Sequence, residues 1–310
     1  MNRLCEILGI KYPIIQGAMA WVSEHRMVAA VSEAGGLGTL ATSDNDVEVI
    51  RREIRGVKAA TDKPFAVNIP MVSVTADAMA QLMIEENVPI VVTAAGNPER
   101  FMKMWKDHGI KIISVVATVR QAEKMVAMGA DVIVAEGYES GGHVGEMTTM
   151  ALVPQVVDKV PVPVVAGGGI ADGRGIAAAF ALGASGVQMG TVFLAAEECM
   201  VHPAYKEMVL RAVPTDVVVT GKRINHGVRC LKNPLTEEFG KLEQAELDRD
   251  AYLNLGAGTL RRAASLGDVE MGSVMAGQIV GLVNEVRPIS QIINDCMEEY
   301  RKVRIALPEL

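Results

Sequence analysis

The chain contains 310 residues, of which 50% are apolar, 22% are charged and 4% are aromatic, and its net charge is −7. This composition excludes a disordered chain, a collagen-like repeat and a coiled coil, and the length suits a single α/β barrel, which commonly needs about 250 residues. The acidic balance argues against nucleic-acid binding over the whole surface, although a local basic patch stays open.

The cysteines and the N-terminus bear on the cellular compartment. Cys5, Cys199, Cys230 and Cys296 lie far apart and include no C-x-x-C pair. They predict neither a disulfide framework nor a zinc cluster, and the cytoplasm is the expected location. Charged residues interrupt positions 1–10, which argues against a signal peptide. We expect no membrane span, because no run of about 18 apolar residues occurs.

Short runs rich in β-branched residues alternate with helical patterns over the first two-thirds of the chain. Eight such runs are expected to be strands: 13–16, 38–40, 65–68, 90–93, 112–116, 132–134, 163–166 and 187–189. Helical spacing lies between them, and Gly35, Gly109, Gly129 and Gly183 follow helical stretches as left-handed caps would. The pattern predicts an α/β fold, a (β/α)8 TIM barrel, while a doubly wound open sheet remains the alternative.

The alternation stops after the eighth run. Residues 194–258 carry three prolines and a polar stretch, and they predict a small appended domain or lid. We therefore divide the chain into a barrel at 1–193, an inserted small domain at 194–258 and a C-terminal segment at 259–310 that returns to the barrel.

The glycine-rich segment 166–172 is the most readable candidate site. Barrels bind ligands at the carboxyl ends of their strands, and this segment follows the seventh strand. Gly167, Gly168 and Gly169 leave backbone N–H groups unobstructed, and the next helix is expected to point its positive end at the same place. Gly190 and Thr191 follow the eighth strand and add donors. A phosphate site is predicted, with tight turns as the alternative.

A second candidate follows the sixth strand. His143 stands after two glycines on a long loop, which suits proton transfer beside a ligand better than core packing. The loop also carries Glu136 and Glu139. An ordinary exposed histidine is the alternative. No histidine pair has metal-ligand spacing, so no metal site is expected, and neither a G-x-S-x-G elbow nor a G-x-G-x-x-G fingerprint occurs.

A run without acidic residues, 217–236, forms a positive island on this acidic protein. It contains Lys222, Arg223, Arg229 and Lys232. A nucleotide phosphate, a phosphopantetheine or an acidic protein partner would suit it, and a solvated surface is the alternative.

Several motifs taken in order resemble the FMN-dependent family that joins nitronate monooxygenase to the flavin-type enoyl-acyl carrier protein reductase II. They are 13–19, 34–38, 63–69, 136–143, 166–173, 188–191 and 272–278. The resemblance runs end to end, and segments 143–149, 202–206 and 273–278 look closer to the reductase branch.

The resemblance implies an FMN site at the barrel mouth. The phosphate would lie on Gly167, Gly168, Gly169, Gly190 and Thr191. The remaining implied contacts are Gly17, Ala18, Met19 and Asn68 along the flavin ring, Glu136 as a polar contact, Met189 in the cleft, and Met275 and Gln278 closing it.

The implied reaction is reduction of trans-2-enoyl-acyl carrier protein thioesters by NADH or NADPH, as in bacterial type II fatty acid synthesis. His143 would stabilise or protonate the enolate. The closest alternative is a nitronate monooxygenase that uses FMN and oxygen, and more distant ones are a flavin-free lyase or isomerase and a non-catalytic binding barrel. The acidic carrier would dock on the positive island, and a homodimer is implied by the family alone.

Overall fold

The computed structural model describes residues 2–43, 45–244 and 248–306. Eight parallel strands form one sheet in the order β1-β9-β8-β6-β5-β4-β3-β2. The strands are β1 (Ile14–Gln16), β2 (Gly38–Ala41), β3 (Phe65–Pro70), β4 (Ile90–Ala94), β5 (Lys111–Val116), β6 (Val132–Glu136), β8 (Val164–Gly167) and β9 (Gly186–Met189). All eight runs expected from the sequence are among them.

The sheet closes on itself between its first and last strands. Ile15 forms a parallel bridge with Leu37, the residue before β2. The Gln16 N–H donates to the Leu37 carbonyl and the Leu37 N–H donates to the Ile14 carbonyl, both at 2.9 Å. This closure confirms the predicted barrel and excludes the open doubly wound sheet.

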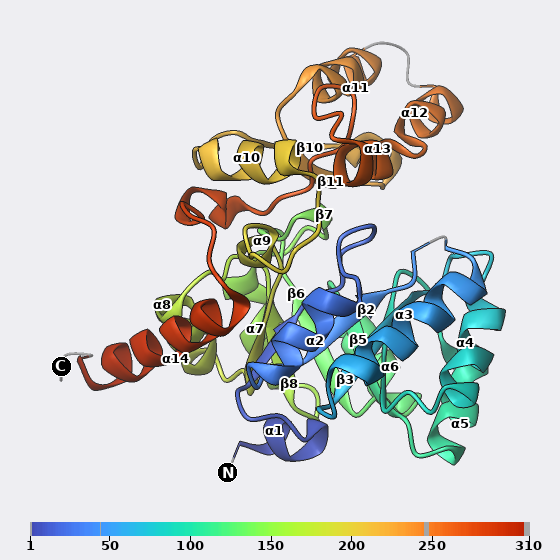
Figure 1. The fold of residues 1–310 in the computed structure, drawn as a ribbon, viewed down its shortest axis with the longest axis vertical. Coiled ribbons are helices and arrows are strands. Elements are labelled where there is room, and N and C mark those ends of the chain that lie inside the picture. Colours follow the sequence, from blue (N-terminus) through green and yellow to red (C-terminus); the bar gives the residue numbers. More distant parts are fainter. Residues whose placement is uncertain (1, 44, 245–247, 307–310) are drawn as a thin grey trace.

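Helices surround the barrel because each presents an apolar stripe to it (Figure 1). In α3, for example, Ile50, Ile54 and Val57 are buried at helical spacing, and Asp46 caps the first turn. The surrounding helices are α2 (His25–Glu33), α3 (Val47–Ala60), α4 (Ala76–Glu85), α5 (Glu99–Asp107), α6 (Val119–Ala127), α7 (Thr149–Val157), α8 (Gly173–Ala181) and α14 (Ile289–Ala306). The four glycines expected at helix ends all have positive φ.

The barrel interior is packed with aliphatic side chains and closed at one end. Helix α1 (Arg3–Leu8) inserts Leu4 and Leu8 into the same cluster as Ile15, Ile113 and Val165. Figure 1 shows α1 at the end of the barrel opposite the small domain. The carboxyl ends of the strands are therefore the end that remains available for a site.

A second layer lies over those carboxyl ends (Figure 1). Its antiparallel sheet has the order β10-β11-β7, from β10 (Val217–Thr220), β11 (Val228–Leu231) and β7 (Gly142–His143). The other elements beyond the barrel are α9 (Thr191–Leu194), α10 (Pro203–Arg211), η1 (Lys222–Ile224), α11 (Pro234–Gln244), α12 (Arg249–Gly256), α13 (Thr259–Leu266) and η2 (Gln278–Leu282). Helices α11 and α12 pack together through the rings of Phe239 and Tyr252. The division at residues 193 and 258 stays a prediction.

Two further features of the described residues bear on the sequence analysis, namely the apolar character of the helices and the state of the cysteines. None of their helices is long and apolar enough to cross a membrane. The four cysteines are free and buried.

The substitution Gly38→Ala tests how tightly α2 packs on the barrel. A Cβ added at Gly38 would lie 2.1 Å from the Val28 carbonyl oxygen, whereas one at Gly240 would meet nothing within 4 Å. We expect Gly38→Ala to lower the free energy of unfolding by about 2 kcal/mol or more, because backbone must move. Gly240→Ala, in a helix interior, should be neutral or slightly stabilising. Denaturant unfolding of both variants checks this, and equal stabilities would contradict it.

Candidate active site at the barrel mouth

The glycine loop after β8 forms a cradle of free donors. Gly168 and Gly169 take φ of +89° and +75°, and a Cβ on Gly168 would lie 2.9 Å from the Gly137 carbonyl oxygen. Within residues 2–43, 45–244 and 248–306, the N–H groups of Gly168, Gly169 and Gly190 donate to no protein acceptor. Free N–H groups beside glycines without side chains suit a phosphate, as the sequence predicts.

The helix after this loop does not contribute as expected. Asp172 caps α8 by accepting from the Arg174 and Gly175 N–H groups at 3.0 and 3.1 Å. The Gly173 N–H donates to the Glu299 carboxylate at 2.8 Å. Because two carboxylates already occupy the positive end of α8, the predicted role of this helix terminus in phosphate binding is wrong.

Thr149 and Glu139 hold the cradle in place. The Thr149 hydroxyl lies 2.9 Å from the Glu139 carboxylate and 3.1 and 3.0 Å from the Gly167 and Gly168 carbonyl oxygens. Its N–H donates to the same carboxylate at 2.8 Å. Sequence reasoning missed Thr149, although a Thr-Thr pair ahead of an apolar run is a recognisable helix start.

The loop after β1 consists of Gly17, Ala18 and Met19. Hydrogen bonds of the Gln16 and Ser23 side chains hold it in place. The buried Gln16 side chain accepts from the Thr39 N–H at 2.9 Å and donates to Ser23, whose hydroxyl accepts from the Met19 N–H at 2.9 Å. The Gly17 N–H donates to the carbonyl of the buried Met189 at 2.9 Å. A Cβ on Gly190 would lie 3.7 Å from the Met19 sulfur, so this loop adjoins the cradle.

Two polar residues lie near the carboxyl ends of β3 and β6. Asn68 near the end of β3 is buried, and its amide lies 3.4 Å from the Val92 carbonyl oxygen. Glu136 ends β6 beside Gly167 in the register of the sheet. Enclosure of its carboxyl group raises the pKa of Glu136 to about 7, although the nearby Ser140 side chain opposes the shift. A carboxyl group that stays protonated near neutral pH can donate as well as accept.

The C-terminal tail crosses the loop that carries His143. The Gln278 N–H donates to the Glu139 carbonyl, and the Gly277 N–H donates to the Thr191 hydroxyl, both at 2.9 Å. A Cβ on Gly141 would lie 2.7 Å from the Ala276 backbone. The Met275 sulfur would lie 3.3 Å from a Cβ on Gly142, so Met275 adjoins the residue before His143. The Gln278 side chain itself is exposed.

His143 faces a second imidazole. Its Nε2 lies 3.2 Å from Nε2 of His226, and the two rings meet edge to face with centroids 4.6 Å apart. Burial by the surrounding protein lowers the pKa of His143, and the charge of His226 lowers it further. Both effects favour the neutral form of the imidazole. Sequence reasoning did not include His226 in the site.

Comparison with known proteins identifies the family of the chain. Residues 1–299 match the nitronate monooxygenase family. The chain belongs to that family.

Three proteins that are similar to this chain carry names of different activities or of none. The structure of FabK from Thermotoga maritima is 44% identical, covers 98% of this chain and 97% of its own, and gives a TM-score of 0.96. A probable nitronate monooxygenase of Staphylococcus aureus is 31% identical over 97% of this chain and 98% of its own. A Mycobacterium tuberculosis protein named (3aS,4S,5R,7aS)-5-hydroxy-7a-methyl-1-oxo-octahydro-1H-indene-4-carboxyl-CoA dehydrogenase is 38% identical over 85% of this chain and 74% of its own.

This member of the nitronate monooxygenase family is a flavin-dependent oxidoreductase, and the family uses FMN. The cradle of free N–H groups fits the phosphate of such a cofactor, and glycine is required there because a side chain at Gly168 would collide with backbone. The individual contacts to FMN remain predictions.

The positive island is only partly a surface. Arg229 is 3% exposed, and its guanidinium donates to the Ser140 and Tyr138 carbonyl oxygens at 3.0 and 2.6 Å. The prediction that Arg229 faces a partner is therefore wrong, because its donors hold the His143 loop. Lys222, Arg223 and Lys232 remain exposed.

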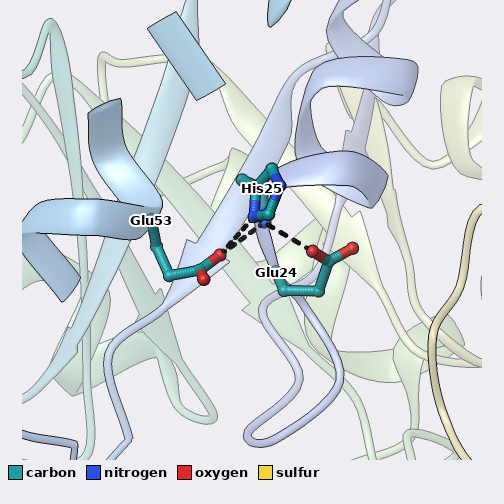
Figure 2. Close-up of side chains that lie close together, drawn as sticks. All are labelled: Glu24, His25 and Glu53. Atoms are coloured by element: carbon teal, nitrogen blue, oxygen red, sulfur yellow. Dashed lines mark hydrogen bonds and ion pairs between the residues drawn. The ribbon is translucent and has the colours of Figure 1, made fainter. Parts of the chain in front are cut away.

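His25, Glu24 and Glu53 form a separate cluster where α2 packs on α3 (Figure 2). The His25 Nδ1 lies 2.8 Å from the Glu53 carboxylate and 3.1 Å from that of Glu24. Glu53 also accepts the His25 backbone N–H at 2.9 Å, and Glu24 caps α2 through the Met27 N–H. These contacts explain the cluster as a link between two helices, and the expected lack of a metal stays a prediction.

Glu136→Gln tests the raised pKa. The folded protein holds this proton up to pH of about 7, whereas an unfolded glutamate loses it near 4.5. Raising the pH from 5 to 8 therefore charges a buried group, and flavin-free wild type should lose stability relative to Glu136→Gln by on the order of 2 kcal/mol. Melting temperatures of both proteins across this range measure the difference. Parallel curves would show that the carboxyl group is already ionised at pH 5.

Proposed function

We propose that the protein is an FMN-dependent reductase of trans-2-enoyl thioesters bound to an acyl carrier protein, with NADH or NADPH as the reductant. The observation that carries this proposal is the place of His143 on the loop over the barrel mouth, where its imidazole meets His226 of the small domain and Met275 adjoins the preceding Gly142. The likeness to FabK, an enoyl-acyl carrier protein reductase II, supports it over 98% of the chain. The CoA thioester in the name of one relative also supports a thioester substrate.

Residues of the barrel strands and of the loops at the barrel mouth would together bind FMN. Gly167, Gly168, Gly169, Gly190 and Thr191 would hold the FMN phosphate. The loop 17–19, Asn68, Glu136 and Met189 would line the rest of the cofactor, with Met275 and Gln278 above it. Bound FMN would supply hydride transfer from the nicotinamide to the substrate β-carbon.

His143 would act on the charge that hydride addition creates. A hydride at the β-carbon places negative charge on the thioester oxygen and the α-carbon. A neutral imidazole N–H can donate a hydrogen bond to that oxygen or transfer its proton to that carbon, and such general acid catalysis contributes about 10²–10⁴-fold.

Nitronate oxidation with oxygen is the second candidate. The family match and the 31% identity to a probable nitronate monooxygenase over nearly the full chain favour it. The same cradle and the same histidine would serve both reactions, so the two candidates differ in substrate rather than in cofactor.

His143→Ala tests the proposed role of the histidine. We expect the variant to stay yellow, because the cradle lies on other residues, and to reduce crotonyl thioesters at least about 10²-fold more slowly than wild type. The assay follows NADH or NADPH oxidation, with aerobic oxidation of an alkyl nitronate measured on the same preparation. Wild-type turnover of the nitronate without thioester reduction would overturn the proposed function in favour of the second candidate.

We also propose that an acidic carrier protein docks on the exposed cations Lys222, Arg223 and Lys232 of the small domain. Cations at the edge of an interface attract an acidic partner and raise its association rate. The homodimer that the family resemblance implies likewise remains a prediction.

Charge reversal tests this docking surface. Arg223→Glu combined with Lys232→Glu should raise the KM for crotonyl-carrier protein several-fold and leave the KM for crotonyl-CoA nearly unchanged. Lys124→Glu, an exposed cation of α6, serves as the control. Equal changes for the two substrates would exclude docking at these positions.

A further inference from the structure

His226 stands on a tightly built turn between β10 and β11. Gly221 takes a φ of +82°, and a Cβ there would lie 2.2 Å from the His226 carbonyl oxygen. The His226 N–H donates to the Gly221 carbonyl at 2.9 Å, and the Gly221 N–H donates to the Glu243 carboxylate at 2.5 Å. These contacts within the small domain hold the backbone of His226 in place.

This turn is joined to the loop of His143 by backbone contacts. Strand β11 pairs with β7 so that Val228 lies opposite His143, and the Val144 N–H donates to the Gly227 carbonyl at 3.0 Å. The buried Arg229 binds two carbonyl groups of the same loop. The paired strands thus fix the distance between the two stretches of backbone that carry the imidazoles.

A contact between two Nε2 atoms at 3.2 Å requires that one of them carries a proton and the other accepts it. A neutral imidazole has a single N–H. If His143 gave its only N–H to His226, its Nδ1 would carry a lone pair and would have no proton for the substrate. If His226 is the donor, the proton of His143 stays on Nδ1 and is available.

We propose that His226 is a positioning residue, which donates its Nε2–H to Nε2 of His143 and keeps the proton of His143 on Nδ1. The proposal rests on the proposed function, in which His143 gives a proton or a hydrogen bond to the reacting thioester. In the proton transfer, the Nδ1–H bond of His143 breaks and leaves its electron pair on Nδ1, a C–H bond forms at the α-carbon with the enolate electron pair, and the imidazolate takes up a solvent proton to restore the neutral imidazole. If His143 instead accepted a proton from the substrate at Nδ1, its own proton would have to lie on Nε2.

Two substitutions separate the hydrogen bond of His226 from its bulk. His226→Gln keeps an N–H donor at a similar reach, whereas His226→Phe keeps a ring without nitrogen. We expect His226→Phe to slow reoxidation of the reduced flavin by crotonyl thioester about 10-fold or more, because the tautomer is no longer held, and to leave flavin reduction by the nicotinamide unchanged. His226→Gln should restore most of the lost rate, and His108→Phe controls for loss of an exposed imidazole.

These rates are measured by stopped flow on the FMN-loaded protein. Wild-type rates in His226→Phe, or a loss in His226→Gln as large as in His226→Phe, would overturn the proposal.

The tautomer can be observed without turnover. The chain has five histidines, so selective ¹⁵N labelling of the holoprotein gives few ring signals, and His143→Ala identifies those of His143. We expect a protonated Nδ1 and an unprotonated Nε2 in wild type and His226→Gln, and a mixture of tautomers in His226→Phe. A protonated Nε2 on wild-type His143 would overturn the proposal. If wild type reduced no thioester, the proposed function would fail while this spectrum still reported on His226.

Discussion

The pairing of β11 with β7 is the interaction on which the site depends. Two residue pairs of backbone, Val228 with His143 and Arg229 with Gly142, join the small domain to the loop that spans the barrel mouth. Arg229 adds two hydrogen bonds to the same loop, and the tail adds another through Gln278. Backbone contacts of this kind do not vary with side-chain rotamers, so the backbone of His143 is held in a defined place at the barrel mouth.

The fold and the cradle could be predicted because their signals are local. Each strand is a short apolar run, and each expected helix-capping glycine has a positive φ. A glycine triplet after a strand also indicates a cradle without any knowledge of distant contacts. The expectation that the N-terminus of α8 binds the phosphate was wrong, although a local signal was available. Asp172 followed by Gly173 is typical of a helix N-cap.

The remaining parts of the site depend on contacts between distant segments. His226 reaches His143 across 83 positions, and Arg229 reaches Ser140 across 89. In the sequence both residues belong to one cationic run, and its composition resembles that of a binding surface. Only the fold separates the buried arginine, which lies within β11, from the exposed Lys222 and Lys232, which lie in η1 and directly after β11.

Division of the site between two chain segments has a consequence for how such proteins diversify. The barrel contributes the seat of the cofactor, while the small domain contributes the imidazole that meets His143. Grafting the upper layer of one relative onto the barrel of another would transfer the proton chemistry and leave cofactor affinity with the recipient. New substrates can therefore be acquired by changing the upper layer, without redesigning the eight-stranded base.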